Sequence, residues 1–320
     1  MARYEDAVWA MTELLRFTDS SMGKRFIEVY EDSMRESVYN GDNFHQLPRG
    51  IVSQLMRQTL TQADPIYVSP TITEMIAYAR ESFEPEPVLP TDMFTACGFA
   101  YLPKPLGIAA SKHPGQEIPV RAVGWVPVEN PQLPGVGGAW IMYWSHKDDP
   151  TPEAGEMNEE ERKLLNSVPF GSLQLCSCFW VPYNSRGWEG IPEGQFRDAN
   201  ISQWTLAQVL WRIGSQVVRT INRPQRSARR EAKRFGVRGD DVTVIQLRKA
   251  SEVVSGGDVD AGESEGGHLT VQFIVRGHWR NQPYGSAGEK VHRQIWISPY
   301  VKGPEDAPFH KTTRVFELVR

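Results

Sequence analysis

The feature of this sequence that most restricts its fold is a change of hydrophobic pattern at Phe83. Before this residue, apolar side chains recur at spacings of three and four, which is typical of amphipathic helices. The first such stripe contains Tyr4, Ala7, Val8, Met11, Leu14, Leu15 and Thr18. After it, apolar and β-branched runs are separated by prolines and glycines, which favours strands. The change predicts an α+β protein in which residues 1–82 form an N-terminal region that is helical throughout.

Residues 83–222 are predicted to form the α+β core. Apolar runs indicate strands near residues 97–102, 120–126, 138–146 and 171–181. A helix over residues 201–222 should follow, with Asn200 as its N-cap. Its broad apolar face contains Trp204, Ala207, Leu210, Trp211, Gly214, Val217, Val218 and Ile221. We therefore expect a mixed or antiparallel sheet around a central buried helix, in which Trp204 and Trp211 are ordinary core residues.

Residues 223–239 are predicted to form a basic helix and linker. Pro224 favours a helix start, and Gly236 should end the helix. From Arg219 to Arg238 the chain holds eight Lys+Arg against one acidic residue, Glu231. A helix would bring Arg226, Arg230 and Lys233 to one face, with Arg229 beside them. This spacing suits contact with successive phosphates, independent of base sequence because no base-reading motif is present.

The charge of the chain is divided unevenly, and this leaves an alternative for the basic helix. Residues 219–320 hold 18 Lys+Arg against 12 Asp+Glu, whereas residues 1–218 hold 17 against 27. The basic part therefore suits an acidic partner, either nucleic acid or an acidic protein surface. Alternatively, the two parts of the chain attract one another, and the basic helix is a surface helix paired with the acidic front.

Residues 240–320 are predicted to form a C-terminal β subdomain. A strand at 242–247 and a Ser/Gly-rich loop at 251–267 lead to a hairpin at 269–306, whose returning strand runs from Val291 to Val301, and a last strand spans Thr313–Val319. The hairpin gathers the candidate binding residues Arg276, His278, Trp279, Arg280, Arg293 and Trp296. Arginine and tryptophan dominate contact energies at interfaces. In a purely structural alternative, Trp279 packs against Trp296, and Arg276 pairs with Glu289 or Asp306.

The hairpin carries a family resemblance. Arg276, Gly277, His278 and Trp279, followed after a turn by Arg293, Trp296, Pro299, Tyr300 and Val301, resemble the C-terminal region of a type V-A anti-CRISPR inhibitor family and its uncharacterised relatives. Weaker similarity lies around Gly98–Pro103, Arg121–Trp125 and the Trp204–Val218 helix. The resemblance implies a phage or mobile-element protein that acts in the cytoplasm of a bacterial host and lowers production of the effector nuclease. The resemblance does not extend to the predicted N-terminal helices or to the basic helix, for which the family has no recognised counterpart.

Several functional classes are disfavoured by the composition. Three cysteines, Cys97, Cys176 and Cys178, provide neither a disulfide framework nor a zinc ribbon, so we expect a reducing cytoplasm and no metal. The N-terminus lacks a basic region followed by an apolar run, and no window approaches the ~18 apolar residues of a membrane span. We therefore expect no membrane association. No cofactor motif is present either.

These observations predict a host-directed binding or regulatory protein that is not an enzyme. Its partner would be a host protein, a nascent chain or RNA, contacted through the hairpin. The alternative is a nuclease in which His278 or His292 acts as acid or base while Arg276, Arg280 or Lys302 stabilises charge on a phosphate. A virion or assembly component is a third hypothesis, and it predicts a stable oligomer.

Overall fold

The computed structural model of the 320-residue chain describes residues 3–36, 48–110, 115–129, 136–150, 173–186, 193, 195–246, 273–275, 278–284, 291–297 and 300–302. The chain divides into two compact units, Met1–Leu247 and Arg248–Arg320. The first holds the described helices and a large sheet. The second holds short strands. The α+β class predicted from the sequence is therefore confirmed.

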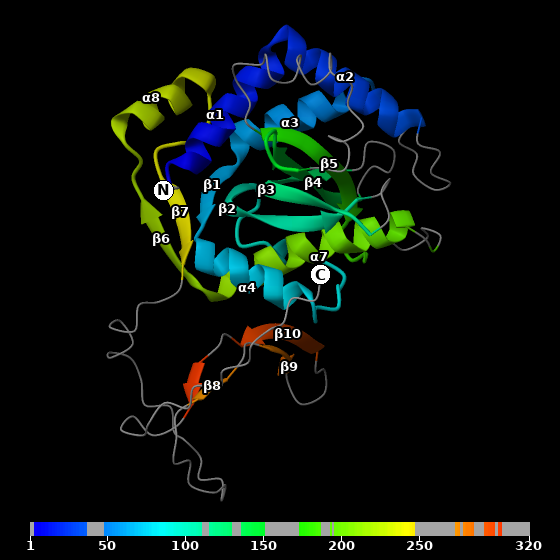
Figure 1. Ribbon diagram of the computed structural model, residues 1–320, viewed down its shortest axis with the longest axis vertical. Coiled ribbons are helices and arrows are strands. Elements are labelled where there is room, and N and C mark those ends of the chain that lie inside the picture. The colour runs from blue at the N-terminus through cyan, green and yellow to red at the C-terminus, as the bar shows by residue number, and fades with distance from the viewer. Residues whose placement is uncertain are drawn as a thin grey trace, which may run out of the picture. The chain divides into compact units, whose positions relative to one another are not determined.

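The first unit is built on a mixed seven-stranded sheet in the order β5-β4-β3-β2-β1-β7-β6 (Figure 1). Its strands are β1 (Asp64–Val68), β2 (Gly98–Ala109), β3 (Glu117–Glu129), β4 (Gly137–His146), β5 (Leu173–Pro182), β6 (Val218–Asn222) and β7 (Val242–Gln246). β1 runs parallel to both of its neighbours, and the other pairs are antiparallel. The four strands predicted between residues 97 and 181 are confirmed as β2 to β5.

Strand β1 corrects the prediction that residues 1–82 are helical throughout. Four of its five residues are buried, and it hydrogen-bonds on both edges, to β2 and β7. A parallel strand buried on both faces reads as a short apolar run without alternation. Ile66, Tyr67 and Val68 form such a run, which is too short to show a period and lies between two helical stripes.

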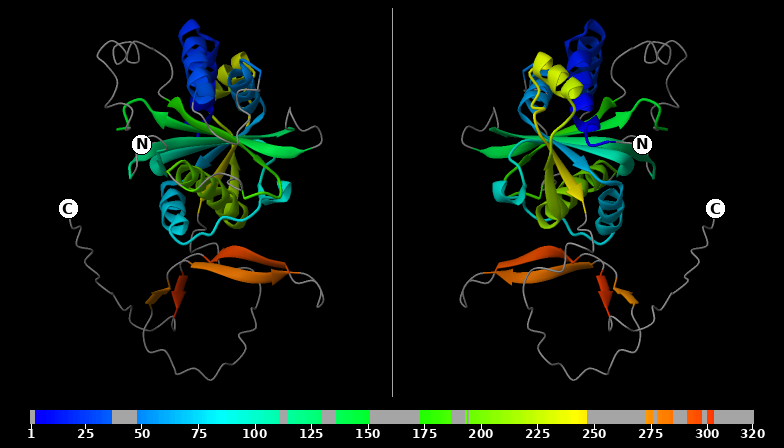
Figure 2. Two further views of the ribbon diagram at one scale, coloured as in Figure 1. Left: turned by 90° about the vertical axis from the view of Figure 1, so that its right-hand side faces the viewer. Right: turned by 90° about the vertical axis from the view of Figure 1, so that its left-hand side faces the viewer.

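Helices cover both faces of the sheet (Figure 2). The helices are α1 (Asp6–Asp19), α2 (Ser21–Glu36), α3 (Ile51–Gln62), α4 (Pro70–Arg80), the short 3-10 helix η2 (Pro90–Asp92), α7 (Gln195–Gln216) and α8 (Arg226–Phe235). α1, α2, α3 and α8 lie on one side, while α4 and α7 pack side by side on the other. The sheet is therefore the middle layer of three. None of these helices, as far as the chain is described, is long and apolar enough to cross a membrane.

Helix α7 is the predicted central helix, but its limits differ from the prediction. It begins at Gln195, so Asn200 lies inside it rather than at its N-cap. It ends at Gln216, and Val218 and Ile221 belong to β6, where Ile221 is 72 % exposed. Pairing of β6 with β7 supplies long-range hydrogen bonds that helical periodicity cannot reveal.

Aromatic rings form the core between α7 and the sheet. Trp125 of β3 packs edge-on against Trp211 at 5.8 Å, and Trp211 packs in the same way against Trp204 at 5.7 Å. All three tryptophans are less than 2 % exposed. Such edge-to-face pairs add to the free energy gained from burial alone. The prediction that Trp204 and Trp211 are core residues is confirmed.

The second unit contains two short antiparallel ribbons, β9 (His278–Tyr284) with β10 (Val291–Ile297), and β8 (Phe273–Val275) with β11 (Tyr300–Lys302). The predicted hairpin and its returning strand are therefore present, and residues 276–277 and 298–299 lie outside the described residues. The loop predicted at 251–267 and the strand predicted at Thr313–Val319 lie outside the described residues.

Candidate functional site

Helix α8 forms where its sequence signals predict it. Pro224 and Gln225 precede its first residue, and Gly236 follows its last in the left-handed conformation, with φ of 70°. The N–H of Val237 donates to the carbonyl oxygen of Ala232 at 2.9 Å, which satisfies an orphan acceptor of the last turn. Gly236 is required here because a left-handed backbone is unfavourable for a residue with a Cβ.

The inner face of α8 fixes the helix against α1. Ala228 and Ala232 are buried, and a Cβ on Gly239 would lie only 2.4 Å from that of Ala232. At the other end of the contact, Arg16 of α1 bonds Glu231 and lies over the ring of Phe235 at 5.0 Å. Small residues thus allow close approach, and the ion pair fixes which face of α8 turns outward.

The outer face of α8 carries the predicted cations. Arg226, Arg230 and Lys233 are exposed, one to two turns apart. Among the described residues, no carboxylate lies within 4.0 Å of any of the three. Arg229 is half-buried and donates instead to the carbonyl oxygen of Pro224 at 3.2 Å.

Three of the neighbouring cations differ from these, whereas Arg223, just before the helix, is also exposed and has no described carboxylate within 4.0 Å. Arg219 lies over the Phe94 ring, Arg234 over Phe235, and Arg238 pairs with Asp64 at 3.0 Å. Glu231, the only acid of the segment, is engaged by Arg16. The described contacts therefore leave Arg226, Arg230 and Lys233 as a basic stripe, the name used below for these three residues, rather than pairing them with the acidic front of the chain.

The predicted hairpin residues that the structure describes are distributed over both faces of the β9–β10 ribbon. Trp279 lies opposite Trp296 in the register of β9 and β10, and Arg280 lies opposite Ile295. Successive residues of a strand belong to opposite faces. Trp279 is half-buried and Arg280 is exposed, in agreement with that alternation.

The other predicted hairpin residues are placed only by the backbone. His278 lies opposite Ile297, and Arg293 lies opposite Gln282. His278 and Arg280 are alternate positions of β9 and so share a face, whereas Trp279 is on the other. Arg276 lies outside the described residues.

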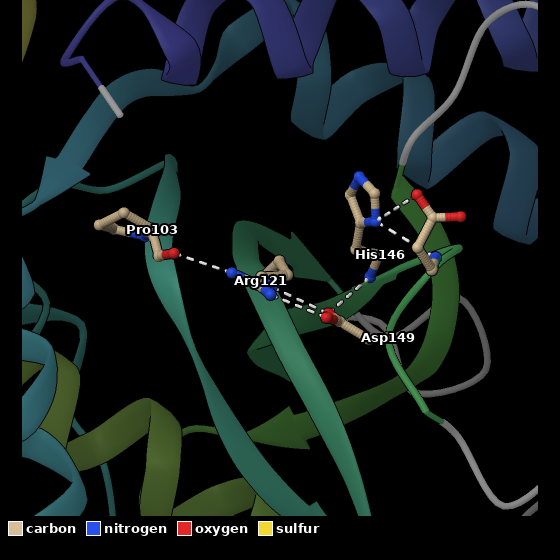
Figure 3. Close-up of polar contacts among 5 residues, drawn as sticks. Pro103, Arg121, His146 and Asp149 are labelled. Carbon is tan, nitrogen blue, oxygen red and sulfur yellow. Dashed lines mark hydrogen bonds and ion pairs between the residues drawn. The ribbon is translucent and has the colours of Figure 1, made fainter. Parts of the chain in front are cut away.

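A polar cluster that the sequence did not reveal joins three strands (Figure 3). Arg121 of β3 donates to both carboxylate oxygens of Asp149, at 2.8 and 2.7 Å, and to the carbonyl oxygen of Pro103 in β2 at 2.8 Å. The N–H of His146, at the end of β4, donates to the same carboxylate at 3.4 Å. The cluster fixes the turn after β4 onto the β2–β3 pair, which is a structural role.

The cluster also shifts the pKa values of its charged groups. Burial alone raises the pKa of Asp149, but the hydrogen bonds and charge of Arg121 outweigh it and hold that pKa below its usual value. The hydrogen bonds to Asp149 raise the pKa of Arg121. Only the isolated arginine in an apolar strand signals this pair in the sequence, because its partner is 28 residues away.

Cys97 and Cys178 are not activated as thiolate nucleophiles. Burial raises the pKa of Cys97 and of Cys178 to about 12, so both are thiols at neutral pH. None of the three cysteines is joined in a disulfide bond. Within the described residues, no group of three His, Cys, Asp or Glu side chains is placed to hold a metal ion.

Comparison with known proteins finds a partial similarity among the solved structures. No family model matches the chain, and no curated protein matches it. Among solved structures, the crystal structure of AcrVA2 is similar at a TM-score of 0.36 and 11% sequence identity. The similarity covers 90% of this chain and 96% of that chain.

Proposed function

We propose that this protein is a non-enzymatic regulatory protein that binds RNA through the phosphate backbone, with the basic stripe of α8 as the principal contact. The observation that carries the proposal is that Arg226, Arg230 and Lys233 are exposed on one helix face without a carboxylate partner among the described residues. A host-directed regulatory role is also what the resemblance of the hairpin to the type V-A anti-CRISPR inhibitor family implies.

The composition of this face favours a polyanion over a protein or a membrane. Protein interfaces have an apolar or aromatic centre, whereas the stripe is formed by cations alone. Membrane-surface helices insert an apolar face, but the apolar residues Ala228 and Ala232 of α8 are buried against α1. Phosphates need only cations at suitable spacing, and their counterions are released on binding.

The hairpin supplies a further contact of the same kind. Arg280 is exposed, and Trp279 beside it in sequence is half-buried on the opposite face of β9. An exposed guanidinium suits a phosphate or the face of an unpaired base. In this proposal Arg276, His278 and Arg293 support the contact of Arg280, and Trp279 with Trp296 stabilises the ribbon.

The test is fluorescence anisotropy with a labelled single-stranded RNA and the matching DNA. The triple substitution Arg226→Gln/Arg230→Gln/Lys233→Gln should weaken RNA binding by tenfold or more and reduce the salt dependence. Loss of three phosphate contacts on a single strand should lower the slope of log K against log salt by roughly 2. Arg280→Gln should give a smaller loss.

A matched control has the same change of charge elsewhere. Lys24, Arg25 and Arg57 are exposed cations of α2 and α3, so Lys24→Gln/Arg25→Gln/Arg57→Gln should leave binding nearly unchanged. Equal loss in both triple variants, or no binding by the wild type, would contradict the proposal. Recovery of intact RNA after incubation distinguishes binding from the nuclease alternative, in which cleavage would depend on His278.

A further inference from the structure

Residues of α4, α7 and the β2–β3 pair line a pocket of about 420 Å³. The two helices lie on the side of the sheet opposite α8 (Figure 2). The pocket has the size of a small-molecule site. Its polar lining comes from Arg80 and Glu81 at the end of α4, Glu117 of β3, and Ser202 and Thr205 of α7. These groups come from three elements that are far apart in sequence.

Arg80 is a cation that its surroundings compensate only in part. Its side chain is 16% exposed, and burial lowers its pKa, opposed chiefly by Glu117. It donates to the carbonyl oxygen of Gly107, but the nearest carboxylate oxygen, on Glu117, is 3.9 Å away and so beyond hydrogen-bond distance. A guanidinium has five N–H donors, and a planar carboxylate matches them in pairs.

Two hydroxyl groups of α7 face the same space with free hydrogen-bonding capacity. Thr205 is 7% exposed and lines the pocket, and its hydroxyl forms no hydrogen bond with any described residue. Ser202 accepts from the N–H of Ala109 at 3.0 Å, while its own proton has no acceptor among the residues described. A hydroxyl on the wall of an open pocket can both donate to and accept from a bound polar group.

The carboxylates lie at the mouth of the pocket, further into solvent than Arg80. Glu117 is 64% exposed on its side chain, and Glu81 is exposed. Cation and hydroxyl groups are therefore inside, and negative charge is outside. We propose that this pocket binds a small zwitterion of the α-amino acid type, with its carboxylate on Arg80 and the hydroxyls of Ser202 and Thr205, and its ammonium group toward Glu117 and Glu81.

The test is isothermal titration calorimetry of the full-length protein with each common L-amino acid, with acetate and methylammonium as single-group controls. At least one amino acid should bind, and more tightly than either control by about tenfold, because both charged groups are paired. Arg80→Gln should abolish the heat of binding. Thr205→Val and the exposed Glu117→Gln should each weaken it several-fold.

Three outcomes would overturn the inference. The first is that no amino acid gives a heat of binding at concentrations up to about 10 mM, at which even weak binding is detected. The second is unchanged binding in both Arg80→Gln and Thr205→Val. The third is acetate binding as tight as that of the amino acid, which would make this a simple anion site. Arg57→Gln, on the far side of the sheet, serves as the matched control and should bind as the wild type does.

Discussion

At the scale of single residues, the carboxylate of Glu31 in α2 joins two helices. It is 4% exposed and accepts from the backbone N–H groups of Gly50 at 2.8 Å and Val52 at 2.7 Å. These donors lie at the N-terminus of α3, where intrahelical partners are lacking. Gly50, the N-cap of α3, has a left-handed backbone and no side chain, so Glu31 performs the capping from a distance.

Glu31→Ala should therefore lower the free energy of unfolding by about 1–3 kcal/mol, because the buried N–H of Val52 and the partly buried N–H of Gly50 lose their acceptor. Urea unfolding followed by tryptophan fluorescence measures the change. Glu28→Ala, on the exposed side of the same helix, is the control and should change stability by less than about 0.5 kcal/mol. Equal effects of the two variants would show that the cap contributes nothing.

The lowered pKa of a second residue, Asp149, predicts that the stability of the fold depends on pH. Its pKa is lower in the folded than in the unfolded protein, so its stabilisation is fully present above the unfolded value of 3.8 and is lost as the pH falls through the folded value. Asp149→Asn should destabilise the protein at pH 7, and the gap from the wild type should shrink below pH 3.8. Unfolding free energies across this range test it, and a constant gap would contradict it.

At the scale of elements, the sequence predicted the helices and strands whose limits depend on residues close together in the chain. The prediction that α8 ends at Gly236 is confirmed. Strands β2 to β5 could also be predicted, because their apolar runs are long. β1 and β6 were missed because each is short and adjoins a helical stripe, so that its apolar residues show no separate strand pattern, and because their pairing partners are remote. The Arg121–Asp149 pair and the Arg80 pocket could not be predicted for the same reason, since each combines residues from separate elements.

Gly236 makes the energetics of α8 testable. Gly236→Ala places a Cβ at φ of 70°, which should cost about 1 kcal/mol and loosen the last turn of α8. Hydrogen exchange measured by mass spectrometry should be faster in the variant at positions 236 and 237, whose N–H groups close that turn in the wild type. Ser227→Ala, on the exposed start of the helix, should leave that exchange unchanged. Unaltered exchange in Gly236→Ala would contradict the role given to the glycine.

At the scale of the whole molecule, the large sheet and its described core lie entirely in residues 1–247. The fully buried tryptophans Trp125, Trp144, Trp204 and Trp211 all belong to this unit. A fragment of residues 1–247 should consequently fold cooperatively, with a urea midpoint of tryptophan fluorescence close to that of the full chain.

Because α8 belongs to this unit, the fragment should also retain the larger share of RNA binding. A folded fragment without RNA affinity would transfer the proposed contact from α8 to the hairpin, while an unfolded fragment would show that the core needs residues 248–320.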